Sequence, residues 1–204
     1  MKLFYTPGAC SLASHIVLRE TGLPFDLVRV DLATGKTETG ADFRAINPKG
    51  YVPALLLDDS QLLTENQVVL QYVADQVPDS HLAPEFGSLA RYRLMEWLAF
   101  ISTELHKGFG PLWNRQLPEV VYQLARERLA NRFDYMERTL LGKDWLDGNH
   151  FSIADAYLFT VLSWTAYHQI DLSPWPNLLA FQQRVAVRPA VHAALKTEGL
   201  TPPG

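Results

Sequence analysis

Cysteine is almost absent from this chain. Cys10 is the only one among 204 residues, so an intramolecular disulfide and a Cys-x-x-Cys redox pair are both excluded. The six histidines show neither HExxH-type nor Cys/His ligand spacing, so no metal site is expected. A single cysteine is typical of a protein in a reducing compartment, and we expect a cytoplasmic protein.

Basic clusters and long apolar runs are also lacking. The net charge is −4 without a block of lysines and arginines, which argues against nucleic acid as a partner. No run of about 18 apolar residues is present to cross a membrane, and the N-terminus lacks the apolar core of a signal peptide. Phosphate-binding loops of the P-loop or GxGxxG type are missing as well. The 48% hydrophobic content is ample for a packed core.

The first part of the chain reads as a small α/β domain, residues 1–77. Apolar alternation and helical spacing predict a strand at 2–5, a helix at 11–21 that Gly22 ends, a strand at 25–30, a short helix near 42–45, and a hairpin of 51–57 with 61–63. Thr64 and Gln67 have capping-box spacing and are expected to open the next helix.

The second part, residues 85–204, is expected to be all-α after a linker at 77–84. A long helical pattern covers 88–107, and further helices follow Pro118 and begin at Ser152, Asn177 and Pro189. Ser152 and Asp155 have the spacing of an N-cap and its N3 partner, which indicates a structural cap. The fold class is therefore α/β followed by all-α.

Cys10 is the first candidate for chemistry. It lies in a Pro-Gly turn between the first strand and the first helix, and the N–H groups of a helix start stabilise a thiolate. The alternative is a buried apolar cysteine without reactivity, because free cysteine is among the most buried residue types.

Two further segments have ligand-binding character. Val52-Pro53 precedes a strand, where a cis peptide would leave the Val52 backbone able to pair with an extended peptide, and an ordinary edge turn is the alternative. Glu65 and Asn66 begin a helix, where free N–H groups attract a carboxylate while Glu65 accepts from an ammonium. Together they suit an amino-acid zwitterion, unless Glu65 only complements the helix dipole.

His106 lies near the expected end of the long helix, before Gly108. A structural role at a helix C-terminus explains it. The alternative is a hydrogen bond from across a cleft to the Cys10 sulfur or to its substrate.

These features in order resemble the bacterial beta-class glutathione S-transferases, and the resemblance covers the whole chain. Five segments carry it: Lys2-Leu3-Phe4-Tyr5 with Pro7-Gly8-Ala9-Cys10-Ser11-Leu12, then 47–55 (NPKGYVPAL), Leu63-Thr64-Glu65, Glu104-Leu105-His106-Lys107, and Ile153-Ala154-Asp155-Ala156-Tyr157. The resemblance implies a thioredoxin-like N-terminal domain, a helical C-terminal domain with a second-substrate pocket, and a homodimer.

The resemblance also implies site residues. Cys10 and His106 become the catalytic pair, Val52 before a cis-Pro53 binds the cysteinyl backbone of glutathione, and Glu65 with Asn66 holds its γ-glutamyl group. The implied glutathione-binding set is Tyr5, Cys10, Lys36, Val52, Pro53, Glu65, Asn66, Ala99, Thr103, Glu104, Leu105 and His106.

Three positions depart from the family pattern. Gly35 stands where the family commonly has lysine, so Lys36 becomes the candidate for the glycine carboxylate of glutathione. Asn66 replaces a common Ser or Gly, and Ala99 stands where an Asn often makes a polar contact.

The resemblance implies a glutathione transferase that directs the glutathione thiolate at small hydrophobic electrophiles. Phe109, Trp113 and Trp164 are candidates for an apolar second-substrate pocket, with core packing as the alternative. A second hypothesis uses Cys10 itself, through a mixed disulfide, for thiol–disulfide exchange, peroxide reduction or dehalogenation. A third is a non-catalytic binding or regulatory protein that retains the fold.

Overall fold

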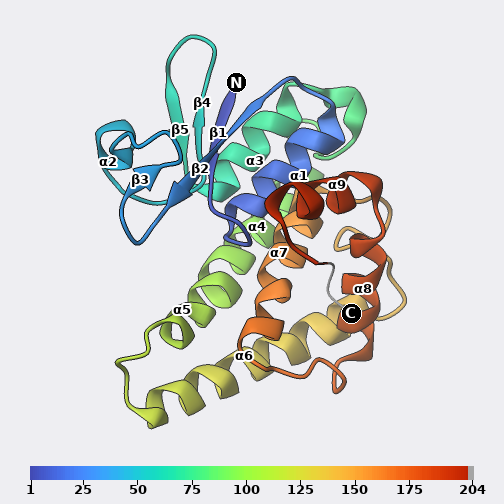
Figure 1. Cartoon of the computed structure of the whole chain (residues 1–204). Coiled ribbons are helices and arrows are strands. Elements are labelled where there is room, and N and C mark those ends of the chain that lie inside the picture. The colour runs from blue at the N-terminus through green and yellow to red at the C-terminus, as the bar shows by residue number, and fades with distance from the viewer. Residues whose placement is uncertain (202–204) are drawn as a thin grey trace. The chain divides into compact units, whose positions relative to one another are not determined.

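The N-terminal part of the chain is built around a five-stranded sheet (Figure 1). This computed structural model describes residues 1–201. The strands lie in the order β3-β2-β1-β4-β5, with bounds β1 (Lys2–Tyr5), β2 (Asp26–Asp31), β3 (Lys36–Thr37), β4 (Ala54–Leu56) and β5 (Leu62–Thr64). β1 pairs with β2 in parallel and with β4 antiparallel, with Phe4 opposite Ala54. The end of β1 therefore lies beside the segment that precedes β4.

Helix α1 (Ser11–Thr21) links this sheet to the other helices of the same unit, and its predicted bounds are confirmed. Leu12, Ile16 and Val17 are fully buried, as their helical spacing predicts. Gly22 ends the helix in the left-handed region at φ 69°, and its N–H donates to the Arg19 carbonyl. α1 packs against both α3 (Asn66–Asp75) and α9 (Pro189–Glu198).

The contacts divide the chain into two units, and the division differs from the expected one in sequence order. Among the described residues, 1–83 group with 187–201, and 84–186 form the second unit. The physical reason is that α9 packs on α1 of the first unit. Residues 202–204, the last three of the expected helical domain, lie outside the described residues.

The second unit is helical, as the sequence predicts. Its elements are α4 (Leu89–Phe100), η2 (Ile101–His106), α5 (Lys107–Trp113), α6 (Glu119–Leu140), α7 (Ile153–Tyr167) and α8 (Pro176–Ala186). Ten consecutive residues, from Ile153 to Leu162, are buried at the start of α7. α7 packs against α4, η2 and α8, so it is the central helix of this unit.

The long helix predicted at 88–107 continues further than expected. Ser88 caps α4, accepting a hydrogen bond from the Arg91 N–H at 3.1 Å. After α4 the backbone adopts a π-helical segment, η2, and then continues as α5 to Trp113. The prediction of a C-cap at Gly108 is therefore wrong. Gly108 packs inside α5, where an added Cβ would meet the Leu129 side chain at 2.9 Å.

The predicted cap at Ser152 is confirmed. The Asp155 carboxylate accepts hydrogen bonds from the Ser152 N–H at 2.8 Å and from the Ser152 hydroxyl at 2.7 Å. It also accepts from the Leu146 N–H at 2.9 Å, which fixes the preceding loop. Burial raises the pKa of Asp155 to about 7, against these three hydrogen bonds that lower it.

Two local predictions in the first unit differ from the structure. Thr64 belongs to β5, and Glu65 takes the N-cap position of α3 with φ 68° and no side-chain cap, so the predicted Thr64 capping box is wrong. The two-residue strand β3 and the short helices α2 (Phe43–Ile46) and η1 (Pro78–Ser80) complete the unit. No helix within residues 1–201 is long and apolar enough to cross a membrane.

Candidate functional site

The turn between β1 and α1 presents Cys10. Gly8 takes φ 71°, a conformation that suits glycine, and the Ala9 N–H closes the turn on the Thr6 carbonyl at 3.0 Å. Cys10 precedes the first residue of α1 and is partly buried. Cys10 is therefore not a buried core cysteine, because it lies at the start of a helix and is not among the buried residues.

The Cys10 thiol donates a hydrogen bond to the Val52 carbonyl at 3.2 Å. The Val52–Pro53 peptide bond is cis, as the resemblance implies. A carbonyl accepts only from the protonated thiol, so this contact favours S–H whereas the start of α1 favours the thiolate. The sequence prediction brought Cys10 and Val52 into one site, and the structure brings them together within the first unit.

Glu65 and Asn66 form the start of α3. Glu65 is one of four non-glycine residues with positive φ among those described, a costly conformation that is common at binding sites. Its carboxylate is exposed and pairs with Lys49 Nζ at 2.7 Å. The Asn66 side chain is buried, and its Oδ1 accepts from the Ser14 hydroxyl at 2.7 Å. The Asn66 Nδ2 atom is buried and has no hydrogen-bond partner among the described residues.

Tyr5 and Lys36 are placed very differently. Tyr5 is buried, and the pKa of its phenol is raised by burial first and by the Glu198 carboxylate second. Its hydroxyl therefore remains protonated at neutral pH. Lys36 is exposed on β3, opposite Asp31.

A buried polar network that no sequence pattern predicted supports the Cys10 turn. Glu198 at the end of α9 accepts from the Gly8 N–H at 2.9 Å, and its other oxygen lies 2.8 Å from His15 Nδ1. Arg19 Nε donates to His15 Nε2 at 2.8 Å. Because Nε2 accepts, the single proton of a neutral ring is on Nδ1 and is donated to Glu198. Only the return of the chain after 187 could have revealed this network, since its partners lie far apart in sequence.

In the second unit, His106 ends the π-helical segment η2. Its Nδ1 lies 2.7 Å from the Tyr157 hydroxyl, and its ring centroid lies 4.9 Å from that of Trp164. Burial lowers the pKa of His106 to about 4, with Lys107 adding to the effect. His106 is therefore neutral at pH 7 and is not a cation at a helix C-terminus, which corrects the structural alternative.

The other residues expected to line the glutathione site in this unit lie on α4 and η2. Ala99 and Thr103 are exposed, and the Thr103 hydroxyl donates to the Ala99 carbonyl at 3.0 Å. Leu105 is fully buried, so only its backbone could contact a ligand. The Glu104 carboxylate is held by Arg132 at 2.7 Å and Arg128 at 3.3 Å, which lowers the pKa of Glu104.

The three aromatic candidates for a second-substrate pocket separate by burial. Phe109 is fully buried and Trp164 is 4% exposed, so both pack in the core of the second unit. Trp113 is 51% exposed and packs edge-on against Trp164 at a centroid distance of 5.9 Å. Of the three, Trp113 alone has a large accessible surface.

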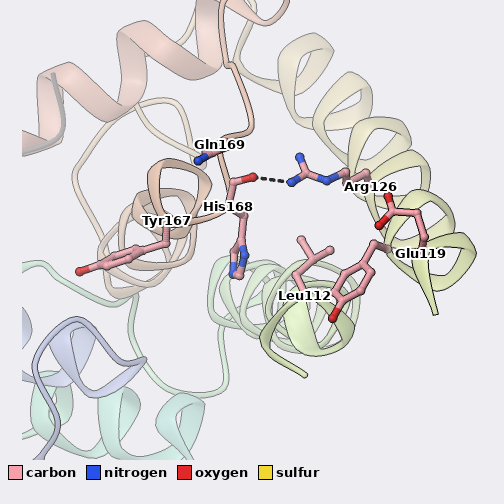
Figure 2. Close-up of a pocket in the computed structure, with 7 residues that line it drawn as sticks. Leu112, Glu119, Arg126, Tyr167, His168 and Gln169 are labelled. Atoms are coloured by element: carbon pink, nitrogen blue, oxygen red, sulfur yellow. Dashed lines mark hydrogen bonds between the residues drawn. The ribbon is translucent and has the colours of Figure 1, made fainter. Parts of the chain in front are cut away.

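A pocket of about 330 Å³ opens at one end of this unit. Figure 2 shows its lining: Leu112, Glu119, Tyr122, Arg126, Tyr167, His168 and Gln169. The Arg126 guanidinium donates to the His168 carbonyl across it. None of the residues predicted for glutathione lines this pocket. Among the described residues there is also no group of His, Cys, Asp and Glu that could hold a metal ion.

Comparisons with known proteins agree with this architecture. Residues 8–76 match the family described as glutathione S-transferase, N-terminal domain, and residues 97–189 match glutathione S-transferase, C-terminal domain. Glutathione S-transferase GstA of Escherichia coli O157:H7 is 52% identical, over 98% of this chain and 100% of that protein.

Two solved structures make the same point. The bacterial beta-class glutathione S-transferase of Sphingomonas chungbukensis is 52% identical with a TM-score of 0.96, and a sphingomonad glutathione S-transferase complexed with glutathione is 51% identical with a TM-score of 0.95. Each comparison covers 98% of this chain and 100% of the other. The chain belongs to the glutathione S-transferase family, and its resemblance to the beta class is confirmed.

Proposed function

We propose that this protein is a glutathione transferase that uses the glutathione thiolate to attack small hydrophobic electrophiles. The observation that carries the proposal is the meeting of the Cys10 thiol with the Val52 carbonyl, next to the cis Pro53, at the start of α1. In the reaction, the proton of the glutathione thiol passes to solvent, and an electron pair of the glutathione sulfur forms the new bond to a carbon of the electrophile. The leaving group departs with the electrons of the bond that breaks.

Each site residue has a proposed role toward glutathione. Val52 pairs with the cysteinyl backbone, Glu65 accepts from the γ-glutamyl ammonium, and the backbone N–H of Asn66 binds the adjoining carboxylate. Lys36 takes the glycine carboxylate. Tyr5, Pro53, Ala99, Thr103, Glu104 and Leu105 complete the proposed binding set.

Lys49 gives the Glu65 role a specific test. Lys49 Nζ lies 2.7 Å from the Glu65 carboxylate and neutralises its charge. The ammonium of glutathione would therefore compete with Lys49 for the carboxylate or share the carboxylate with Lys49. Glu65→Gln removes the charge but retains an acceptor, and calorimetry should show about tenfold weaker glutathione binding. Glu96→Gln, an exposed carboxylate paired with Arg93, is the matched control. Unchanged affinity in Glu65→Gln would remove Glu65 from the site.

The role of Cys10 is testable by one substitution. We propose that Cys10 forms a mixed disulfide with glutathione in redox reactions and only positions glutathione during conjugation. Cys10→Ala should then retain conjugation of an aryl halide and lose disulfide reductase activity. Equal loss of both activities would show that conjugation and disulfide reduction need Cys10 alike, and would contradict a covalent role in redox reactions alone.

A homodimer is proposed from an exposed apolar face. Phe86, Leu89, Tyr92 and Met95 recur at spacings of three residues along and before α4, and all four are exposed. Helix residues three positions apart are neighbours, although such a row winds around the helix by about 60° at each step, so Leu89, Tyr92 and Met95 form a slanted stripe. An exposed apolar stripe on a charged protein indicates a covered surface. We expect sedimentation to show a dimer that Leu89→Glu dissociates. A wild-type monomer at micromolar concentration would contradict the assignment.

The remaining alternative is a binding or regulatory protein without catalysis, which fold alone does not exclude. Absence of glutathione binding at millimolar concentration would favour it. We also propose a cytoplasmic location, which the single cysteine supports.

A further inference from the structure

The Tyr157 hydroxyl contacts the His106 imidazole within the second unit. Its oxygen lies 2.7 Å from His106 Nδ1, and the two rings are perpendicular, with an interplanar angle of 90° and centroids 5.9 Å apart. Tyr157 is 1% exposed and lies in α7, within the run of buried residues that begins the helix. The core therefore holds this hydroxyl in place.

Hydrogen bonding decides which nitrogen of His106 carries the proton. Burial keeps the ring neutral by lowering its pKa to about 4, and a neutral imidazole has one N–H and one acceptor nitrogen. A phenol is a stronger donor than a neutral imidazole N–H, and an imidazole nitrogen is a stronger acceptor than a phenol oxygen. Tyr157 therefore donates to Nδ1, and the proton of His106 is on Nε2.

A second contact fixes the plane of the ring. Trp164 packs edge-on against His106, with an interplanar angle of 74°. His106 also ends the π-helical segment η2, and π-helical turns are frequent at functional sites. With Nδ1 bound and the plane held, the direction of Nε2–H is determined.

We propose that Tyr157 is a positioning residue for the transferase reaction: its hydroxyl fixes His106 as the Nε2–H tautomer, so that His106 presents a neutral N–H donor to its substrate. The inference rests on the proposed function. A neutral donor stabilises the thiolate without transferring its own proton, so the thiol proton passes to solvent and His106 keeps the same proton throughout.

The first test reads the tautomer directly. In protein labelled with ¹⁵N in histidine, nitrogen NMR of wild type at pH 7 should show the His106 proton on Nε2 and an unprotonated Nδ1. Tyr157→Phe removes the donor to Nδ1, so the Nδ1–H tautomer should gain population. Tyr135→Phe, a half-exposed tyrosine on α6, is the matched control and should leave the His106 signals unchanged. A wild-type ring protonated on Nδ1 overturns the proposal, whether or not any variant folds.

The second test reads catalysis. Tyr157→Phe should lower kcat for aryl-halide conjugation about tenfold, the usual scale for a residue that orients a functional histidine. KM for glutathione should change little, because the tripeptide contacts are untouched. In a His106→Ala background, Tyr157→Phe should cause no further decrease in kcat. Additive losses, or an unchanged kcat, would overturn the proposal. Wild-type protein without conjugation activity would instead refute the proposed function, and the NMR result would still decide the tautomer.

Discussion

Replacing Glu198 by glutamine tests the buried network beneath the Cys10 turn. The carboxylate accepts from two donors at once, the Gly8 N–H at 2.9 Å and His15 Nδ1–H at 2.8 Å. Arg19 Nε donates a hydrogen bond to His15 Nε2, so the His15 proton cannot move to Nε2 if Nδ1 loses its acceptor. A glutamine amide has one acceptor oxygen and one NH₂ group, so whichever way it turns, its NH₂ faces one of the two donors.

The expected cost follows from that mismatch. Leaving one buried donor unpaired costs about 1–3 kcal/mol. We therefore expect Glu198→Gln to lower the free energy of unfolding by about 1–3 kcal/mol. Urea unfolding followed by circular dichroism measures this value. Glu96→Gln, in an exposed pair with Arg93, should change it by less than about 0.5 kcal/mol.

Glutathione binding should also weaken in the Glu198→Gln variant. Glu198 links the Gly8 N–H of the turn that presents Cys10 to His15, so the loss of either hydrogen bond should loosen the turn and weaken glutathione binding. If Glu198→Gln were as stable as the Glu96→Gln control, the two-donor geometry and the His15 tautomer derived from it would both be wrong.

Two further predictions concern the second unit. Ser152→Ala removes one of the three hydrogen bonds to Asp155 and should cost about 1–2 kcal/mol in urea unfolding; an unchanged midpoint would show that the cap is unimportant. The pKa of His106, about 4, lies below its ordinary value, so the unfolded chain takes up this proton first as the pH falls. Stability from His106 is therefore complete above about pH 6.5 and decreases towards pH 4, by at most about 3 kcal/mol. The difference between wild type and His106→Gln in unfolding free energy across this range measures the effect, and a difference that is independent of pH would contradict the neutral buried ring.

Local signals in the sequence predicted much of the fold. The bounds of α1, its end at Gly22 and the cap at Ser152 each depend on a few neighbouring residues, and all three are confirmed. The strand β3 was missed because two residues carry no periodicity, and its pairing with β2 defines it. The π-helical segment was also missed, since a single pattern of apolar residues fits α4, η2 and α5 alike.

The candidate site was predictable in part. The resemblance identified Cys10, Val52 and Glu65, which the structure places around the turn after β1 and the start of α3. The contacts that hold these groups were not predictable, because Glu198 and His15 are separated by 183 positions. Tyr157 lies in a segment that the resemblance singled out, but only the folded second unit shows its hydroxyl at His106.

The most direct test of the central claim is the ionisation of glutathione on binding. In stopped-flow mixing with reduced glutathione at pH 7, thiolate absorbance should rise in wild-type protein, and conjugation of an aryl halide should follow. Because a bound thiol with a pKa lowered by about two units is mostly ionised at neutral pH, the absorbance change should approach one thiolate per site. No absorbance change together with no conjugation would contradict the assignment of this protein as a glutathione transferase.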